Sequence, residues 1–467
     1  TSNNILKMRN SANDGWIDLR TLTGGLTSAA DATINSVTVG KGANSVANNT
    51  VLGVSALDAS VTGDNNTAIG KNALTTNTSG ATNTAVGSSS LENNTTGSNN
   101  VGFGTGTLTA NTTGSNNVAI GNNSLDASET TGNNTAVGHE SMTTTTTGSS
   151  NVAIGYQSLR QQTTGSNNTA LGFQAVYTNT TASNNTGIGY NALLLNTTGT
   201  SNVAVGSLAL DANTTGQQLT AIGYNSLSAN TTASYNTALG DNSLAGNTTG
   251  NNNVAVGVLT LDANSTGSFN VGIGVNSLGA NTTANSNTAV GHQALLLNTT
   301  GASNVAVGAN ALDANTTADG NTAVGASALS ANTTGTVNTA VGRQALQTNT
   351  TGSYNHAFGY LALQLNETGS RNVAAGYAAL RQNTTGGDNV AIGYNTLDAN
   401  TTGTNNIGVG MEALRYVTTG SNNVAIGLDA LEDNTASNNT AVGHNALMEN
   451  TTGTQQVAVG ALALDAN

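Results

Sequence analysis

The sequence of 467 residues contains no cysteine and no proline, and only 3% of its residues are aromatic and 7% charged. Without cysteine, no disulfide can stabilise the chain. The net charge of −13 is spread thinly, so the surface is a poor match for a polyanion and we expect no nucleic acid partner. No apolar run approaches the roughly 18 residues that span a bilayer, so we expect no membrane insertion.

Glycine, asparagine and threonine dominate instead, with aliphatic residues at fixed spacing among them. One glycine recurs every 17 residues from Gly53 to Gly427 and then at Gly443 and Gly460, which gives 25 copies. The single short step falls at residues 433–436. Each copy follows the pattern N-[TV]-A-[VI]-G-x-x-[AS]-L-x-x-N-T-T-G-x-x. Such repetition predicts stacked structural units rather than separate globular domains.

Before the glycine, the pattern alternates a β-branched, a tiny and a large apolar residue, which is the period of a strand. A helix is disfavoured because Gly, Thr and Asn are weak helix formers. A coil with this strand and a second one around the Ala-Leu pair cannot bury its apolar face alone, so coils must stack about 4.8 Å apart. We therefore predict an all-β fold, a parallel β-solenoid (β-roll) of about 25 coils with a 17-residue repeat.

Stacking places identical positions in columns. We expect the apolar residue before the glycine and the Leu after it to fill the interior, and Asn side chains to pass amide hydrogen bonds between coils. Thr-Thr pairs would form hydroxyl columns, and the glycine would need positive φ or close backbone approach. The tiny residue indicates close packing, against another copy of the chain or a neighbouring wall of the same coil. These columns are represented by Gly70, Gly87, Asn83, Asn100, Leu74, Leu91, Val86 and Ile69.

The segments NSVTVG (35–40) and NNTVLG (48–53), with the recurring NNVAIG, resemble the head repeats of trimeric autotransporter adhesins of the YadA type. That resemblance implies a left-handed parallel β-roll whose chains associate side by side as a homotrimer. The adhesin repeat is typically shorter. The copies in this sequence are longer because they carry an added N-T-T-G segment. Residues 3–24, which contain the only Trp, are similar to short stretches near the N-termini of phage tail-fibre proteins, and imply a virion fibre.

Three parts of the chain are expected. Residues 1–30 form an N-terminal capping or attachment segment, residues 31–48 a transition into the solenoid, and residues 49–467 the shaft. A solenoid needs its first coil covered, which is the simplest role for the first part. The last residue falls in mid-repeat, so we expect that the chain continues or that a partner covers this end.

No catalytic residue, metal site or cofactor is expected. His139, His292 and His444 follow the repeat glycine nine coils apart, roughly 43 Å, so they cannot share a metal or a proton, and His356 occupies another position. Asp recurs after the repeat Leu, as in Asp211, but adjacent coils seldom share it, which makes a weak calcium pattern. The N-T-T segments match the glycosylation acceptor pattern, but glycans on every coil of one ladder would clash, which favours a structural role.

Seven aromatic residues directly follow the repeat glycine and form one stripe. Our first interpretation is a stacked ladder that stiffens the rod or fills an interchain groove. The alternative is a contact surface for a receptor or glycan, because exposed aromatic side chains often anchor partners. The stripe consists of Tyr156, Phe173, Tyr190, Tyr224, Tyr360, Tyr377 and Tyr394.

Three functions of different classes remain. The first is a non-enzymatic, extracellular fibre shaft of a virion or cell-surface appendage that presents or acts as an attachment surface. The second is a bacterial surface adhesin that binds a host ligand along its flank. The third is an ice-binding solenoid, because regular Thr and Asn arrays order water and the repeat resembles the N-x-V-x-G coils of some antifreeze β-rolls. We rank it last, since an ice face needs only a few coils.

Overall fold

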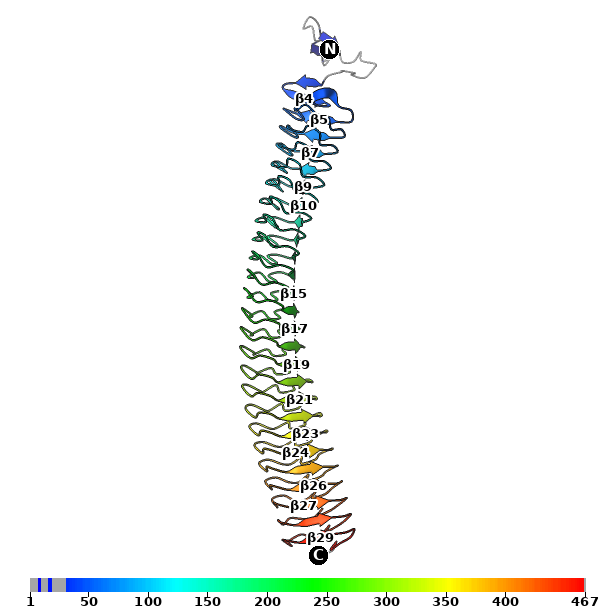
Figure 1. Cartoon of the computed structure of the whole chain (residues 1–467), viewed down its shortest axis with the longest axis vertical. Coiled ribbons are helices and arrows are strands. Elements are labelled where there is room, and N and C mark those ends of the chain that lie inside the picture. The colour runs from blue at the N-terminus through cyan, green and yellow to red at the C-terminus, as the bar shows by residue number, and fades with distance from the viewer. Residues whose placement is uncertain (1–6, 10–15, 19–30, 466–467) are drawn as a thin grey trace, which may run out of the picture. The chain divides into compact units, whose positions relative to one another are not determined.

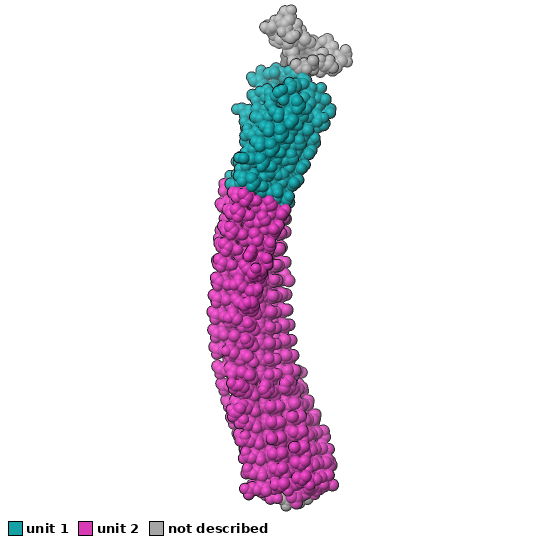
Figure 2. Space-filling view, in the orientation of Figure 1, with its two compact units in different colours: residues 1–157 teal, residues 158–467 magenta. Residues whose placement is uncertain are grey.

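The computed structural model describes residues 7–9, 16–18 and 31–465. Over these residues the chain is an all-β parallel β-solenoid of about 24 turns with a 17-residue repeat and almost no helix. The predicted solenoid and its period are confirmed, while its handedness and its trimeric association stay predictions. The chain divides into two compact units, residues 1–157 and 158–467 (Figure 2). Each turn of the parallel ladder contains one short strand, and several of these strands are labelled in Figure 1.

Unit 1 begins with antiparallel pairs and continues as a parallel ladder. Strand β1 pairs antiparallel with β2, and β3, β4 and β5 pair antiparallel in chain order. From β5 to β11 every pair is parallel. The elements are β1 Lys7–Arg9, β2 Trp16–Asp18, β3 Ala32–Ile34, β4 Val37–Gly40, the 3-10 turn η2 Ala43–Ser45, β5 Thr50–Gly53, β6 Thr67–Ile69, β7 Thr84–Val86, β8 Val101–Phe103, β9 Val118–Ile120, β10 Thr135–Val137 and β11 Val152–Ile154.

Unit 2 is a parallel ladder throughout its described residues. Each strand from β12 to β29 pairs with the next one in chain order. The strands are β12 Thr169–Leu171, β13 Thr186–Ile188, β14 Val203–Val205, β15 Thr220–Ile222, β16 Thr237–Leu239, β17 Val254–Val256, β18 Val271–Ile273, β19 Thr288–Val290, β20 Val305–Val307, β21 Thr322–Val324, β22 Thr339–Val341, β23 His356–Phe358, β24 Val373–Ala375, β25 Val390–Ile392, β26 Ile407–Val409, β27 Val424–Ile426, β28 Thr440–Val442 and β29 Val457–Val459.

Equivalent residues of successive strands lie opposite one another. Val307 of β20 faces Val324 of β21, and the Gly308 N–H donates to the Val290 carbonyl at 2.8 Å. The same register holds at the one short repeat, where Val424 of β27 faces Thr440 of β28. The turn at residues 433–436 therefore absorbs the missing residue, and the predicted columns form.

The inner face of each strand carries the tiny residue rather than the large apolar ones. Ala85 of β7 is fully buried, whereas Val86 of β7 and Ile69 of β6 are only half-buried. The prediction that Val86 and Ile69 fill the interior is therefore wrong. Leu74 and Leu91 do fill it, with no exposed surface. The walls of a coil lie so close that Leu on one side leaves room only for a methyl group on the other, so the tiny residue packs against its own coil.

Four coils carry Gly instead of Ala on the inner face, each opposite a branched or hydroxyl side chain. A Cβ at Gly272 would lie 2.6 Å from Thr260 Cγ2, and one at Gly187 would lie 2.5 Å from Val176 Cγ2. Contacts this short are overpacked, so Ala would not fit at these two positions unless the opposite side chain moved. The other two pairings are Gly408 with Thr396, and Gly102 with Ser90 and Thr107.

The segment after the recurring glycine is a turn, so the predicted second strand around the Ala-Leu pair is wrong. Leu91 has φ 53° and Ser89 has φ 56°, both left-handed. This conformation costs a non-glycine residue about 1–2 kcal/mol. Backbone hydrogen bonds offset the cost, since the Leu91 N–H donates to the Thr107 carbonyl at 2.9 Å and the Asn94 N–H to the Leu91 carbonyl at 3.2 Å. Each coil thus has one strand.

The recurring glycine, here called the anchor glycine, has no room for a side chain. Gly87 has φ 138°, and a Cβ there would lie 2.2 Å from the Gly104 carbonyl oxygen. At Gly70, with φ 130°, the corresponding distance to the Gly87 oxygen is 2.4 Å. Both predicted causes, positive φ and close backbone approach, are confirmed at these positions.

Two columns of buried Asn run along the interior, and one Asn from each column donates to a shared backbone carbonyl, as at Gly97. In the first, the Asn100 N–H donates to Asn83 Oδ1 at 3.0 Å, and Asn83 Nδ2 to the Gly97 carbonyl at 2.9 Å. In the second, Asn94 Nδ2 donates to Asn77 Oδ1 at 2.9 Å and to the same Gly97 carbonyl at 3.0 Å. The predicted amide ladder is confirmed, and it satisfies polar groups that burial would otherwise leave unpaired.

The Thr-Thr pairs form a column of a different kind from the one predicted. The first hydroxyl donates to a backbone carbonyl of the next coil, as Thr214 Oγ1 does to the Thr231 carbonyl at 2.9 Å. The second residue of that pair, Thr215, is exposed. The column is therefore made of hydroxyl-to-backbone bonds, with one exposed hydroxyl per pair on the outside.

The expected N-terminal parts are described unevenly. Most of residues 1–30, the expected capping or attachment segment, lies outside the described residues, which include only β1 and β2 of it. Residues 31–48 contain β3, β4 and η2. The Asp31 carboxylate accepts hydrogen bonds from the Lys41 and Gly42 N–H groups at 2.6 and 2.5 Å. The strands of this segment pair antiparallel, unlike those of the coils, and its role as a transition stays a prediction.

Candidate functional site

The strands expose an uncharged face that repeats with the coils and consists of one wholly apolar row and one row in which Thr and Val or Ile are equally frequent. We define the outer face as the residues one and three before each anchor glycine in β5–β29. The residue one before it is apolar in all 25 coils, and neither position is buried in any coil. Neither position holds Asp, Glu, Lys or Arg in any coil. Solvent-facing strands usually carry polar or charged side chains, so this composition is typical of a covered surface.

The seven predicted aromatic residues all lie exposed beside the outer face. In unit 1, Tyr156 stacks on His139, with ring centroids 5.7 Å apart and planes 9° from parallel. In unit 2, Phe173 stacks on Tyr190 at 5.4 Å and 13°. Tyr224 is 53% exposed. Successive coils thus bring aromatic neighbours into stacking distance wherever the sequence supplies them.

The largest aromatic ladder runs through three successive coils of unit 2. Tyr377 and Tyr394 stack at 5.1 Å and 11°, and Tyr360 is tilted by 50° against Tyr377 at 5.7 Å. The Arg343 guanidinium lies 5.8 Å from the centre of the Tyr360 ring, within cation–π range. Stacking covers the ring faces, so this ladder offers mainly ring edges and hydroxyl groups to a partner.

A second column, five residues before the anchor glycine, contains a few exposed large apolar residues that the sequence analysis missed. Most coils place Asn or Ser there, and the larger residues are scattered. The usable signal was local: in residues 354–360, four aromatic or imidazole rings occupy alternate positions. Phe358 of β23 is 46% exposed beside fully buried Ala357. The exposed members of this second column are Tyr235, Phe269, Val337 and Tyr354.

The four histidines do not converge. His139 belongs to the aromatic stripe of unit 1, and His356 lies half-buried on the outer face of β23. His292 and His444 follow their anchor glycines in other coils. Over the described residues, none of them belongs to a group of three side chains placed to hold a metal.

Among the Asp residues after the repeat Leu, Asp211, Asp262 and Asp313 lie half-buried in separate coils, and Asp398 is buried. Burial raises the pKa of Asp211, Asp262 and Asp313, and backbone N–H groups of each Asp and the following residue lower it to a smaller extent. Asp398 pairs with Arg381, whose Nε lies 2.9 Å from Asp398 Oδ1. There too burial raises the pKa more than the arginine lowers it. These carboxylates lie apart rather than in a shared ion site.

Three acidic side chains do meet in unit 2, around an arginine. The carboxylates of Glu412, Asp429 and Glu432 have oxygens within 4.8 Å of one another. Arg415 Nη1 lies 2.9 Å from Glu412 Oε2 and 3.6 Å from Glu432 Oε1, so it neutralises part of this charge. Burial, and then repulsion by the neighbouring carboxylates, raises the pKa of Asp429 and Glu432. The sequence analysis missed this cluster because its members come from two coils.

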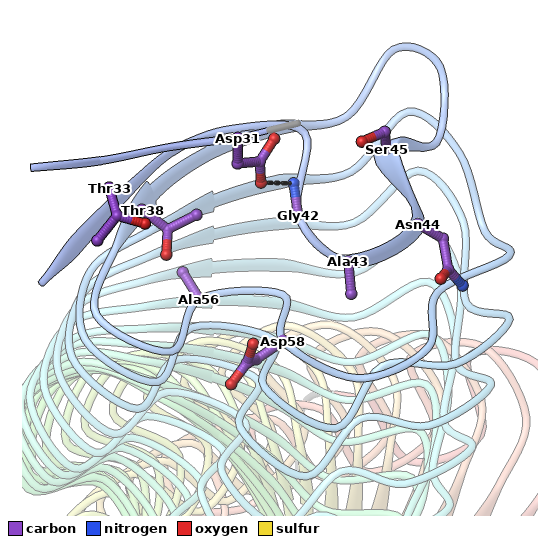
Figure 3. A pocket seen from close by; sticks show the side chains of 9 residues that line it. All are labelled: Asp31, Thr33, Thr38, Gly42, Ala43, Asn44, Ser45, Ala56 and Asp58. Carbon is purple, nitrogen blue, oxygen red and sulfur yellow. Dashed lines mark hydrogen bonds between the residues drawn. The ribbon is translucent and has the colours of Figure 1, made fainter. Parts of the chain in front are cut away.

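A pocket of about 310 Å³ lies at the start of unit 1, between the β3–β4 segment and the first coil. Figure 3 shows the Asp31 carboxylate turned toward the Gly42 N–H, with Asp58 on the coil beneath. Thr33, Thr38 and Ser45 also line it. Asp31 already accepts two backbone hydrogen bonds there, so its carboxylate is occupied in holding the segment together.

The asparagines of the N-T-T segments are interior groups. Asn213 is fully buried, and its Nδ2 donates to Asn196 Oδ1 at 2.8 Å and to the Gly216 carbonyl at 3.0 Å. A glycan cannot be attached to such an amide in the folded chain. The match to the glycosylation pattern is therefore explained by the ladder.

The described residues include no helix with the length and apolar character needed to cross a membrane. No family model matches the sequence, and no curated protein matches it either. The resemblance to YadA-type adhesin heads and to phage tail fibres therefore stays a prediction from the sequence.

Proposed function

We propose that the chain is the structural shaft of an extracellular fibre, carried by a virion or a cell surface, in which copies associate side by side through the outer face. The observation that carries this proposal is the unbroken apolar column one residue before the anchor glycine, which contains no charged residue in any coil. A shaft needs to hold an attachment surface away from its base and requires no catalytic group.

The size of the outer face supports association. A strand of three residues is about 10 Å long, and 18 strands about 4.8 Å apart span roughly 80 Å, so unit 2 presents about 800 Å². About half of this area, the row one residue before the anchor glycine, is apolar in every coil, and monomeric proteins rarely expose apolar patches larger than a few hundred Å². A standard interface buries about 800 Å² on each partner. The face of unit 2 alone is therefore large enough for a specific complex.

The period of the face favours a second copy of the chain as the partner. Its apolar side chains recur once per coil, and a partner of the same fold presents side chains at the same spacing. Three copies are the number implied by the resemblance to the adhesin heads. In such an assembly the outer faces would turn inward, and the exposed Thr hydroxyls of the Thr-Thr pairs would face water.

One local size match also supports packing on this face. Phe358 is the largest residue of the column in unit 2, and Ala375, directly opposite it in β24, is the smallest. A column open to water needs no such compensation. In a packed column, a large residue requires a small neighbour to keep the density of a protein interior.

Charges placed on the outer face test the association. We expect sedimentation velocity to give a trimer for the native chain and a monomer for the variant Val307→Glu with Val324→Glu, because each carboxylate would be buried unpaired. The control variant, Thr317→Glu with Thr334→Glu, changes exposed residues away from the outer face and should remain trimeric. A native chain that stays monomeric at micromolar concentration contradicts the proposal.

The location is tested separately. Immunogold labelling with an antibody against unit 2 should decorate fibres on the surface of the source particle or cell. Labelling confined to the cell interior would exclude the fibre function, whatever the oligomeric state.

The exposed tyrosine ladder favours a second candidate, an adhesin that binds a host ligand along its flank. The variant Tyr360→Ser, Tyr377→Ser, Tyr394→Ser separates the two candidates. Binding of the labelled protein to host cells should be unchanged if the chain is only a shaft, and should fall at least tenfold if these rings anchor a ligand. The solenoid should remain folded in both cases, because all three side chains are exposed.

A further inference from the structure

The second Asn column of unit 1 is interrupted in two successive coils. Asn94 and Asn111 continue the column, but the next two coils carry Ser128 and Thr145, both fully buried. Asn111 Nδ2 still donates to Asn94 Oδ1 at 2.7 Å. Its own Oδ1, which would normally accept from the next Asn, is buried without a hydrogen-bond partner, and so is Thr145 Oγ1.

Ser128 and Thr145 have shorter side chains than the Asn that they replace. Ser128 lacks the amide group of an Asn, and Thr131 stands in this coil where most others carry Gly. The Thr131 hydroxyl contacts Ser128 Oγ and accepts from Asn134 Nδ2 at 3.1 Å. Thr131 thus satisfies the first Asn column, while the two unpaired oxygens of the second column remain.

We propose that this gap binds two waters inside the solenoid, one between Asn111 Oδ1 and the Ser128 hydroxyl and one between the Ser128 hydroxyl and Thr145 Oγ1, since equivalent atoms of adjacent coils lie about 4.8 Å apart. An unpaired buried polar group costs about 1–3 kcal/mol. A buried water usually makes about three hydrogen bonds to groups that would otherwise be unpaired. Here two hydroxyls and one amide oxygen lie along one column within three successive coils, which supplies the required partners.

A second interruption of the same column, in unit 2, shows what a dry gap looks like. Val417 stands where the column would have Asn, and Asn400 Oδ1 is again unpaired. Val417 is fully buried and offers no polar atom. A water there would have too few partners, so the proposal applies to the hydroxyl-lined gap of unit 1 alone.

Water in place of amides should make these coils the easiest part of the unit 1 ladder to open. The amide column normally joins adjacent coils directly, whereas a bridging water can exchange with solvent. Amide hydrogen exchange on the full chain should therefore be fastest, within the ladder from β5 to β11, in residues 121–150.

The variant Thr145→Val gives opposite results for a wet and a dry gap. In a wet gap one of the two waters loses a partner, so amide exchange of residues 121–150 should become about tenfold faster. In a dry gap the substitution removes an unpaired buried hydroxyl at constant shape, and exchange should slow. Slower or unchanged exchange overturns the proposal.

A second variant restores the Asn column, so the proposal can still be tested if Thr145→Val fails to fold. Ser128→Asn, Thr131→Gly and Thr145→Asn restore the repeat pattern, and exchange of residues 121–150 should slow at least tenfold. A high-resolution crystal structure of the native chain should show water within hydrogen-bond distance of Asn111 Oδ1, and that of the variant should not. Direct bonds from Ser128 or Thr131 to Asn111 Oδ1, with no water, would refute the proposal.

Discussion

Along β12–β29 the inner-face residue is Ala or Gly in every coil, whereas the outer-face residue that follows it ranges from Ala375 to Phe358. The inner residue is fixed by the opposite wall of the solenoid, as the pairing of Gly272 with Thr260 shows. No comparable contact within the coil fixes the outer residue, yet it is always apolar. The size of the inner residue is therefore limited by packing inside the solenoid. The apolar character of the outer residue requires a separate cause, such as a partner that covers the strands.

The contrast between the constrained interior and the outer face would be wrong if a side chain at an anchor glycine were tolerated. Gly308→Ala should have the largest effect, lowering the free energy of opening its coil by about 3–5 kcal/mol. Gly308 has φ 136°, and a Cβ there would lie 2.6 Å from the Gly325 carbonyl. The quantity to measure is the free energy of local opening from native-state hydrogen exchange, because long repeat arrays do not unfold in two states.

Gly301→Ala is the matched control. A Cβ at Gly301 would approach the Ala318 carbonyl oxygen at 2.4 Å, which suggests a clash just as severe. The equivalent position nevertheless holds Ala284 one coil before it and Ala318 one coil after it. We expect a cost of about 1 kcal/mol, because only Gly308 combines the close contact with a left-handed backbone. Equal costs would show that backbone conformation is not what fixes the anchor glycine.

Removing one rung of an Asn column should have the next largest effect. Asn315→Ala leaves Asn298 Oδ1 without its 2.9 Å hydrogen bond and opens a small cavity, at a cost of about 2–3 kcal/mol. The same exchange measurement on this coil checks it. Thr317→Ala, on the exposed outside of the same coil, should stay within about 0.5 kcal/mol of the native chain. Comparable losses would mean that the interior is no more constrained than the outside.

A pair of substitutions sharpens the comparison by testing the match between opposite walls. Gly272→Ala should cost about 1–2 kcal/mol, because its Cβ would meet Thr260 Cγ2. Adding Thr260→Ser removes that methyl group and creates the pair that Ser277 and Ala289 already form one coil later. The double variant should recover most of the loss in a double-mutant cycle. A loss that Thr260→Ser leaves unrepaired would point to a cause other than the opposite wall.

Much of the interior was predictable from the sequence, because stacked copies must repeat whatever keeps a coil intact. The spacing of Gly87 and its equivalents gave the coil, and the Asn83 and Asn100 positions gave the ladder, since a buried amide needs a partner in the next coil. Burial of Leu91 followed from its being the large apolar residue that almost every copy keeps.

The assignment of the two faces was not predictable from alternation alone. A period of two separates the faces of a strand but does not say which one is inside, and size suggested that Val86 would be. The answer depends on the width of the coil, which follows from the left-handed turn at Leu91. Propensity gives no warning of that turn, since Leu rarely adopts this conformation. The outer aromatic stripe was predicted as a stripe, whereas the scattered second column was not.

The smallest expected effect concerns the half-buried carboxylates between the two faces. Burial raises the pKa of Asp211, Asp262 and Asp313 above the ordinary value of 3.8, so the folded chain holds these protons more tightly than the unfolded chain. Their contribution to stability is therefore greatest below pH 3.8 and is lost as pH rises through the raised pKa values. Replacing all three by Asn should raise the free energy of opening their coils at pH 7 relative to the native chain and flatten this dependence, as measured by native-state hydrogen exchange between pH 3 and pH 7.

Asp388 provides a control of opposite sign. Its carboxylate accepts two hydrogen bonds from Arg371, at 2.6 and 2.8 Å, and these lower its pKa below 3.8. The pair contributes stability above pH 3.8 that is lost as pH falls through the lowered pKa, so Asp388→Asn should reduce stability slightly at pH 7. The effect is small because both side chains are exposed to solvent. If both variants shifted stability in the same direction at pH 7, burial would not be what separates these carboxylates, and the division between interior and outside would fail for charged groups.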